Sequence, residues 1–336
     1  MAAVRKLTVS KYLTVLVSLF LVTIIVTVIS LLSGSTDISV QQLLDVIFGK
    51  SNDGNFSKII LEIRLPRIML AIAAGGGLSV AGAVFQAILM NPLAEPYILG
   101  ISSGGTFGAI LSFLLGFTFI GTQIFSFAGA MAVIFIVFMV GKRFGEIEPN
   151  VLLLTGVMIG AFFSAAILLM MTMLSDSLRS AFLWLIGNLS SADAASSYYV
   201  LVISIIVSIL LSINSYKYNV LALGAENAKH LGVNTNVLKN VTYILASILV
   251  GAIVSVSGII GFVGLLVPHI CRMIFGIDNR LVVPASFFIG AIYLLISDTF
   301  ARTIVSPAEL PVGAITAVIG APIFIYVLRR RFNLIT

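Results

Sequence analysis

The feature that most constrains this chain is a series of apolar runs, most of them about as long as a bilayer is thick. A helix of about 20 apolar residues spans the hydrocarbon core of a membrane. The strands of a membrane β-barrel alternate polar and apolar residues, whereas these runs are continuously apolar, so the spans are helices. We therefore expect an all-α integral membrane protein with about ten transmembrane helices. The expected spans are residues 12–32, 68–90, 98–115, 124–140, 151–174, 198–213, 241–257, 259–274, 281–296 and 312–328.

The composition excludes a soluble protein. Hydrophobic residues make up 60% of the 336 residues and charged residues only 10%, against about 25% charge in a soluble domain. The net charge of +6 comes from cations that cluster at span ends, as in loops that face anionic lipid, so it needs no nucleic-acid partner. The single cysteine, Cys271, excludes an intramolecular disulfide and a cysteine-based metal cluster. We expect one lipid-embedded domain over residues 1–336.

The positive-inside rule orients the chain. Cations lie before the first span, in residues 141–150 and 215–239, and after the last span. These segments, and hence both termini, are expected in the cytoplasm. The first run is interpreted as a retained span, because it is long for the apolar region of a signal peptide and no small-x-small cleavage site follows. On the outer side, short helices are expected around residues 40–48 and 181–187.

A glycine-rich break separates the seventh and eighth expected spans. Residues 241–277 are too many for one transmembrane helix. Gly258, Gly261 and Gly264 permit the chain to reverse direction there. We therefore expect two spans in this stretch rather than one.

A long polar stretch, residues 212–239, separates the sixth and seventh spans and contains a short helix between Gly224 and Gly232. Glu226 lies near the start of this helix and Lys229 and His230 near its end, which suits the helix dipole. A short charged helix delimited by glycines is suited to docking on another protein. A solvated loop helix is the alternative that the residues leave open.

The chain carries no motif of its own for catalysis or for driving transport. The pattern G-x-x-x-x-G-K-[ST] is absent from the sequence, as are HExxH and GxSxG, so we expect neither ATP binding nor an enzyme. Energy would come from a partner or from an ion gradient. Ion-coupled carriers tend to place carboxylates in mid-span, which weakens the second alternative because the acidic residues here lie at or near span ends. They include Glu62, Glu95, Asp176, Asp278, Asp298 and Glu309.

Three arginines lie on the expected outer face. Arg64 and Arg67 open the second span, and Arg302 follows the ninth. They run against the cytoplasmic bias of cations. One interpretation is that they contact solvent or lipid head groups. The sharper one is that they hold carboxylates of an external protein, since a guanidinium pairs bidentately with a carboxylate.

The segment Asn91-Pro92-Leu93-Ala94-Glu95-Pro96 forms a stiff turn after the second span. Two prolines within five residues cannot continue a helix. The turn either ends the helix and nothing more, or it constricts the inner mouth of a transport path.

Longer motifs resemble a known family. Residues 64–67 read RLPR, residues 79–86 read SVAGAVFQ and residues 91–104 read NPLAEPYILGISSG. Further motifs are LGAENAKHLGV at 223–233, GFVGLLVPHICR at 261–272 and AELPVG at 308–313. Together they resemble the permease subunits of ABC importers for iron–siderophores, haem and cobalamin, the FecCD-type family. The resemblance extends from residue 62 to residue 330.

The resemblance implies the fold of a type II ABC importer permease, which has ten spans and works as a homodimer or as a heterodimer with a sister chain. The path would lie at the dimer interface, lined by the fifth and tenth spans. Two separate ATPase subunits would bind ATP and Mg²⁺, and an external substrate-binding protein would deliver the cargo, so this chain would hold no cofactor or metal. The residues implied for ATPase coupling are Gly224, Ala225, Glu226, Asn227, Ala228, Lys229, His230, Leu231, Gly232 and Val233.

The same resemblance implies two further groups of residues. Arg64, Arg67 and Arg302 match the outer arginines that receive glutamates from the two lobes of the binding protein. A cytoplasmic gate is implied at two segments, of which the second departs from the Thr/Ser pair of the cobalamin importer. The gate residues are Asn91, Pro92 and Leu93 in the first segment and Glu148, Pro149 and Asn150 in the second.

These expectations combine into a multi-pass permease of the bacterial cytoplasmic membrane that imports a ferric siderophore. Cobalamin and haem are the alternatives for the cargo. No residue discriminates among them, because the external protein selects the cargo. From a different class, a stand-alone ion-coupled carrier is the alternative.

Overall fold

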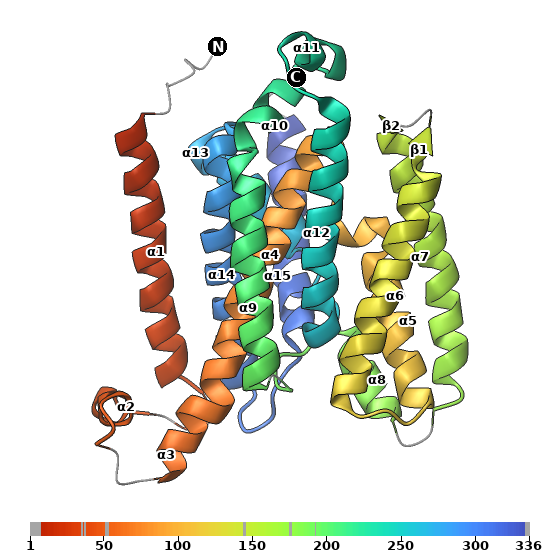
Figure 1. Cartoon of the computed structure of the whole chain (residues 1–336). Coiled ribbons are helices and arrows are strands. Elements are labelled where there is room, and N and C mark those ends of the chain that lie inside the picture. The colour runs from red at the N-terminus through yellow and green to blue at the C-terminus, as the bar shows by residue number, and fades with distance from the viewer. Residues whose placement is uncertain are drawn as a thin grey trace.

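The computed structural model describes residues 8–34, 36, 38–50, 54–143, 146–174, 177–191 and 193–332. Within these residues the chain is a bundle of helices with one short hairpin (Figure 1). In chain order the elements are α1 (Val9–Leu32), α2 (Val40–Ile47), α3 (Gly54–Lys58), the π-helix η1 (Ile59–Arg64), α4 (Leu65–Ile88), the 3₁₀-helix η2 (Pro96–Leu99), α5 (Ile101–Leu114), α6 (Phe119–Val140), β1 (Lys142–Arg143), β2 (Glu146–Ile147), α7 (Pro149–Met171), α8 (Leu178–Leu185), α9 (Ala194–Ile213), α10 (Ser215–Leu221), α11 (Ala225–His230), α12 (Thr235–Ser257), α13 (Val263–Phe275), α14 (Asn279–Thr303) and α15 (Val312–Phe332).

Ten apolar helices in the described part of the chain correspond to the ten expected spans. Seven are long enough to cross a membrane: α1, α4 with the helical turns that precede it, α6, α7, α9, α12 and α14. The shorter ones are α5, α13 and α15. The expectation of about ten transmembrane helices is confirmed. The largest boundary difference is at α14, which ends at Thr303 rather than 296, so Arg302 lies in its last turn instead of following the ninth span. α12 begins at Thr235 rather than 241, because the side chain of Asn234 accepts a hydrogen bond from Val237 N (3.1 Å) and caps an extra polar turn.

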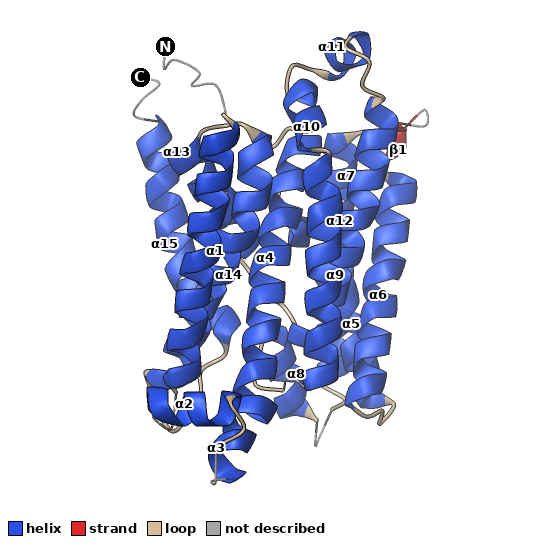
Figure 2. Cartoon of the chain, turned by 60° about the vertical axis from the view of Figure 1, so that its left-hand side comes forward, coloured by secondary structure: helices blue, strands red, loops and turns tan. Residues whose placement is uncertain are grey.

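The two ends of the bundle carry different short elements. α10, α11 and the β1–β2 hairpin lie at one end, called the α11 end, and α2, α3 and α8 lie at the other, called the α2 end (Figure 1). The hairpin is antiparallel, with Lys142 opposite Ile147. α1 begins and α15 finishes at the α11 end (Figure 2). The first and last described helices therefore share an end with the expected ATPase-coupling segment, while the side of the membrane stays a prediction.

α4 is the centre of the bundle. From Leu70 to Phe85 every residue of α4 except Ile72 is buried, and α9, α12, α13 and α14 pack around it. Glycines allow backbone-to-backbone contact. An added Cβ at Gly75 would lie 2.3 Å from the carbonyl oxygen of Gly290, and one at Gly82 would lie 1.8 Å from that of Gly264.

α5 and α13 are preceded by breaks that contact each other. Gly258, with a φ of 67°, ends α12, and the chain reverses into α13 as expected. At the contact, Ile260 N donates a hydrogen bond to the Tyr97 hydroxyl (3.1 Å) and Phe262 N donates one to the Glu95 carboxylate (2.9 Å). Backbone groups that lack a helical partner must be satisfied inside a membrane protein, so each break stabilises the other.

The outer helices are lightly covered by the rest of the chain. α7 exposes large apolar side chains, among them Leu154, Met158 and Phe162. α1 and α6 expose similar apolar faces. Without a covering element in this chain, such faces contact lipid or another chain.

Candidate functional site

α11 projects from the bundle between two residues with positive φ. Gly224 and Gly232 have φ of 101° and 82°, which side chains other than glycine rarely adopt, so the chain turns sharply before and after the helix (Figure 1). Among the expected coupling residues, Ala228 and Val233 are buried and Gly224 and Ala225 are half-buried. The exposed ones are Glu226, Asn227, Lys229, His230, Leu231 and Gly232.

An ionic contact joins α11 to the hairpin that precedes α7. Lys229 Nζ lies 2.9 Å from Glu146 Oε1, and the Asn236 side chain donates to the same oxygen at 3.1 Å. These two hydrogen bonds lower the pKa of the Glu146 carboxyl, so the carboxylate is charged at neutral pH. Three elements, β2, α11 and α12, therefore meet at one carboxylate oxygen.

The second expected gate segment follows this contact directly. Glu148 is the residue before α7, and Pro149 and Asn150 are its first two residues. Glu148 N donates to Gly141 O at 3.1 Å, which closes the hairpin. Farther along α7, an added Cβ at Gly156 would lie 2.6 Å from Ile98 O. α7 is thus in backbone contact with η2.

The first expected gate segment is a turn fixed by its own side chain. Asn91 Oδ1 accepts a hydrogen bond from Leu93 N at 2.9 Å, a local bond that favours turns over helix. Pro92 and Leu93 are exposed. Among the described residues no hydrogen bond joins this turn to residues 148–150. The two gate segments are connected through α7 and η2 instead.

Arg67 and Arg302 share one buried carboxylate at the α2 end. Asp298 lies 2.9 Å from Arg67 Nε and 3.1 Å from Arg302 Nε, and its side chain is fully buried. Arg67 Nη1 also lies 2.6 Å from Oε2 of Glu309, whose side chain is 37% exposed. Two cations and two anions balance, which a buried ionic cluster requires. The cluster ties α4 to α14 and to the segment before α15.

The same face of the bundle holds the end of α1. The last carbonyls of a helix have no partner inside the helix, and here arginine side chains supply the donors. Arg302 donates to Ser30 O and Ser33 O (3.1 and 3.0 Å), and Arg64 donates to Leu31 O, Leu32 O and Thr36 O. All three arginines expected to face an external protein are only 4% exposed. In this structure they satisfy and neutralise groups of their own chain.

Sequence reasoning missed three of these partners. Asp298 and Glu309 were noted as acids near span ends but not as partners of the arginines. The spacing of Asp298 and Arg302, four residues apart on one helix, was the available signal. Glu146 had no comparable signal, because its partners Lys229 and Asn236 are distant in sequence. No cluster of three or more His, Cys, Asp or Glu that could hold a metal occurs among the described residues.

Comparison with known proteins decides the family. The profile of the FecCD transport family matches residues 22–330. This chain belongs to the FecCD transport family. It is 38% identical over 320 residues to the Fe(3+)-citrate import system permease protein YfmE of Bacillus subtilis, covering 93% of each chain. It is 39% identical over 281 residues to the hemin transport system permease protein HmuU of Yersinia pestis, covering 81% of this chain and 84% of that one.

The fold agrees with that of a solved transporter structure. An inward-facing structure assigned to the metal-chelate type of ABC transporter superposes with a TM-score of 0.84 at 32% identity, covering 94% of this chain and 99% of that chain. This FecCD member is therefore a multi-pass membrane permease of an ABC importer. It is a transporter subunit rather than an enzyme, since the ATPase of this family is a separate chain. An ion-coupled carrier is excluded by this membership.

Proposed function

We propose that this permease pairs with a second permease chain to form the path of an importer for a ferric siderophore. α11 carries the proposal, because a protruding charged helix suits a docking partner and its Lys229 is bonded to the segment that leads into α7. The relative named for Fe(3+)-citrate supports an iron chelate as cargo, and the metal-chelate type structure supports a metal chelate. The hemin relative makes haem the second candidate, and cobalamin is the third.

In this proposal the α11 end faces the cytoplasm of a bacterium, with both chain termini on that side. Two ATPase subunits bind ATP and Mg²⁺, and one docks on residues 224–233 of each permease chain. Their movement displaces α11, and the Lys229–Glu146 contact passes the displacement to the start of α7. α7 and α15 line the path, and residues 91–93 and 148–150 close its inner mouth.

At the α2 end, an external binding protein would dock over Arg64, Arg67 and Arg302. The half-exposed Glu309 supports an exchange of carboxylates on Arg67, because it is the more accessible of the two carboxylates that pair with this arginine. A glutamate of the docking protein would replace Glu309 on Arg67 while Asp298 keeps its place.

Co-purification from native membranes in mild detergent, followed by mass spectrometry and uptake assays, tests the assembly. We expect an ATPase and a binding protein to accompany the chain, and ATP-dependent uptake of a labelled ferric siderophore. A co-purified sister permease would show a heterodimer. Uptake of haem or cobalamin without uptake of any ferric siderophore would overturn the cargo while leaving the importer intact.

Replacing Glu226 with arginine tests the docking helix. Glu226 is exposed in the first turn of α11, and a reversed charge within a docked interface costs several kcal/mol, so uptake should fall at least about tenfold. The amount of protein in the membrane should not change. Glu226→Asp, which keeps the charge, is the control and should transport as the unmodified chain does. Normal uptake by Glu226→Arg would contradict docking at α11.

A further inference from the structure

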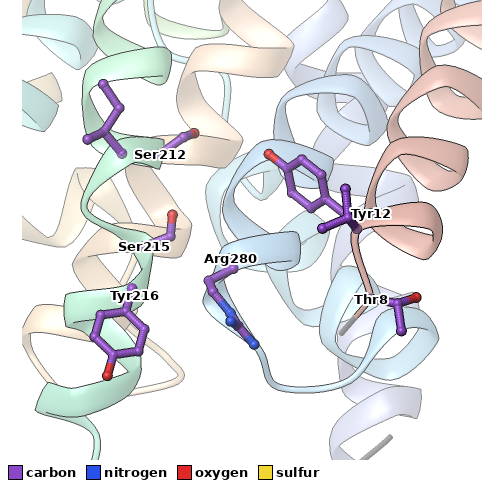
Figure 3. Close-up of a pocket in the computed structure, with 8 residues that line it drawn as sticks. Thr8, Tyr12, Ser212, Ser215, Tyr216 and Arg280 are labelled. Carbon is purple, nitrogen blue, oxygen red and sulfur yellow. The ribbon is translucent and has the colours of Figure 1, made fainter. Parts of the chain in front are cut away.

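Glu95 is an acidic residue with no cationic partner in the described part of the chain. Arg280, by contrast, lines a cleft of about 330 Å³ at the α11 end (Figure 3), and its Nη2 lies 2.6 Å from Oδ2 of Asp278. The half-buried Glu95 makes one hydrogen bond among the described residues, which its Oε1 accepts from Phe262 N at 2.9 Å. Its role is therefore not the pairing of charges.

Glu95 lies inside the bundle, although the sequence analysis expected it near the end of a span. Pro96, the next residue, packs against Gly264 of α13. An added Cβ at Gly264 would lie 2.7 Å from Pro96 Cδ and 2.9 Å from the carbonyl oxygen of Leu78. Leu78 is ten residues before the end of α4, which is about 15 Å along a helix. Ionisable residues at such depth in a membrane protein are costly and usually serve a function.

The two segments that Glu95 joins each contain a residue with a strained backbone. Among the non-glycine residues that the structure describes, only Met90 and Phe262 have a positive φ, of 49° and 68°. Met90 precedes the Asn91–Leu93 turn, and Phe262 is the residue before α13. Such conformations persist only where the surroundings enforce them, and they concentrate at switches and functional sites. At Phe262 the bond to Glu95 is part of that enforcement.

The Phe262 side chain connects this break to α15. An added Cβ at Gly320 would lie 2.7 Å from Phe262 Cβ and 3.0 Å from its Cγ, so the phenylalanine lies directly on the backbone of α15. Phe324, one turn farther along α15, belongs to the same apolar cluster. α15 packs mainly against α13 and α14. A shift of Phe262 would therefore displace α15.

We infer that Glu95 and Phe262 are positioning residues that make the Asn91–Leu93 turn and α15 move together. Glu95 attaches the turn to Phe262, and Phe262 attaches the break before α13 to Gly320. A movement of the turn is then passed to α15 through one hydrogen bond and one side-chain contact. The inference rests on the proposed function, in which the turn closes the path and α15 lines it. It adds that opening the inner mouth and reshaping the path are one event.

The uptake of a labelled ferric siderophore per ATP hydrolysed, in the transporter reconstituted with its ATPase, tests this role. Glu95→Ala removes the acceptor and should lower the ratio about tenfold, as expected for loss of a hydrogen bond to a carboxylate. Glu95→Gln keeps an oxygen acceptor and should stay within about threefold of the unmodified chain. Asp193→Ala is the matched control, because it removes a carboxylate that accepts from Ser196 N (3.1 Å) at the start of α9. It should leave the ratio unchanged.

Gly320→Ala tests the same connection from α15 and keeps the test valid if Glu95→Ala fails to fold. The added methyl group pushes Phe262 away and should lower the ratio about fivefold or more. Gly261→Ala is its control, because a methyl group there meets nothing within 4 Å. An unchanged ratio in Glu95→Ala and Gly320→Ala, or an equal loss in Glu95→Gln and Glu95→Ala, would overturn the inference.

Thermal unfolding of the purified permease in detergent tests the connection without transport. Glu95→Ala and Gly320→Ala both act on Phe262, so their losses of melting temperature should not add in the double variant. The losses from Asp193→Ala and Gly320→Ala, on separate elements, should add. Full additivity of the first pair would overturn the connection. An unmodified transporter that shows no ATP-driven uptake would refute the proposed function and leave the result of this unfolding experiment standing.

Discussion

At the scale of single residues, the arginines at the α2 end show how a charge is tolerated inside an apolar chain. Arg64 and Arg302 donate to the last carbonyls of α1, which have no partner in the helix. Arg67 and Arg302 are neutralised by Asp298. Their cost of burial is therefore offset by hydrogen bonds that the fold itself needs. Any docking role for them is added to this structural one.

Arg67 pairs with two carboxylates, the buried Asp298 and the partly exposed Glu309. Substituting each one in turn compares the stability that a buried and an exposed ion pair contribute. Asp298→Asn leaves Arg67 and Arg302 without their shared buried anion, and breaking such a pair costs about 3–5 kcal/mol of stability. Glu309→Gln removes a carboxylate that is partly solvated, at a cost of about 1 kcal/mol or less. Thermal unfolding in detergent should show a large drop in melting temperature for the first and little for the second. Equal melting temperatures would contradict the central place of Asp298.

At the scale of elements, the hairpin before α7 connects α11 to α7. Through it, a partner docked on α11 could move α7. Glu146 receives hydrogen bonds from both α11 and α12, and only two residues separate it from α7. α7 is among the least covered of the long helices. A helix with few contacts to the rest of the bundle, joined to Glu146 by only two residues, follows a movement of the hairpin more readily than a buried helix does.

A charge exchange tests this link. Glu146→Lys and Lys229→Glu should each lower uptake per ATP hydrolysed by about threefold, because an exposed ion pair contributes up to about 1 kcal/mol. The double variant restores the attraction and should recover most of the loss, measured in the transporter reconstituted with its ATPase. If Lys229 instead contacts the ATPase, Lys229→Glu would impair assembly and the double variant would not recover.

At the scale of the whole molecule, packing is concentrated on α4 and is sparse at the periphery. Small residues let α13 and α14 approach α4 at backbone distance. The outer helices leave large apolar surfaces for lipid or a second chain. A rigid centre with loosely held outer helices suits a protein that opens and closes a path at its edge.

Gly82→Ala should disrupt this centre. The added methyl group would lie 1.8 Å from the carbonyl oxygen of Gly264, so α4 and α13 must separate, at a cost of at least about 1–3 kcal/mol. Size-exclusion chromatography should show loss of the monodisperse protein. Gly261→Ala is the control, because a methyl group there meets nothing within 4 Å. A well-folded Gly82→Ala protein would contradict the close contact of the two helices.

Hydropathy and charge were sufficient to predict the helical class, the number of spans and the segments that share an end, because each depends on residues close together in the chain. Local motifs were sufficient for the family. The contacts of the site were not predictable in this way. The burial of Arg64, Arg67 and Arg302 and the bond between Glu146 and Lys229 each depend on which helices are neighbours. That is decided by the packing of glycine-lined helices around α4, which brings together side chains as much as 272 residues apart.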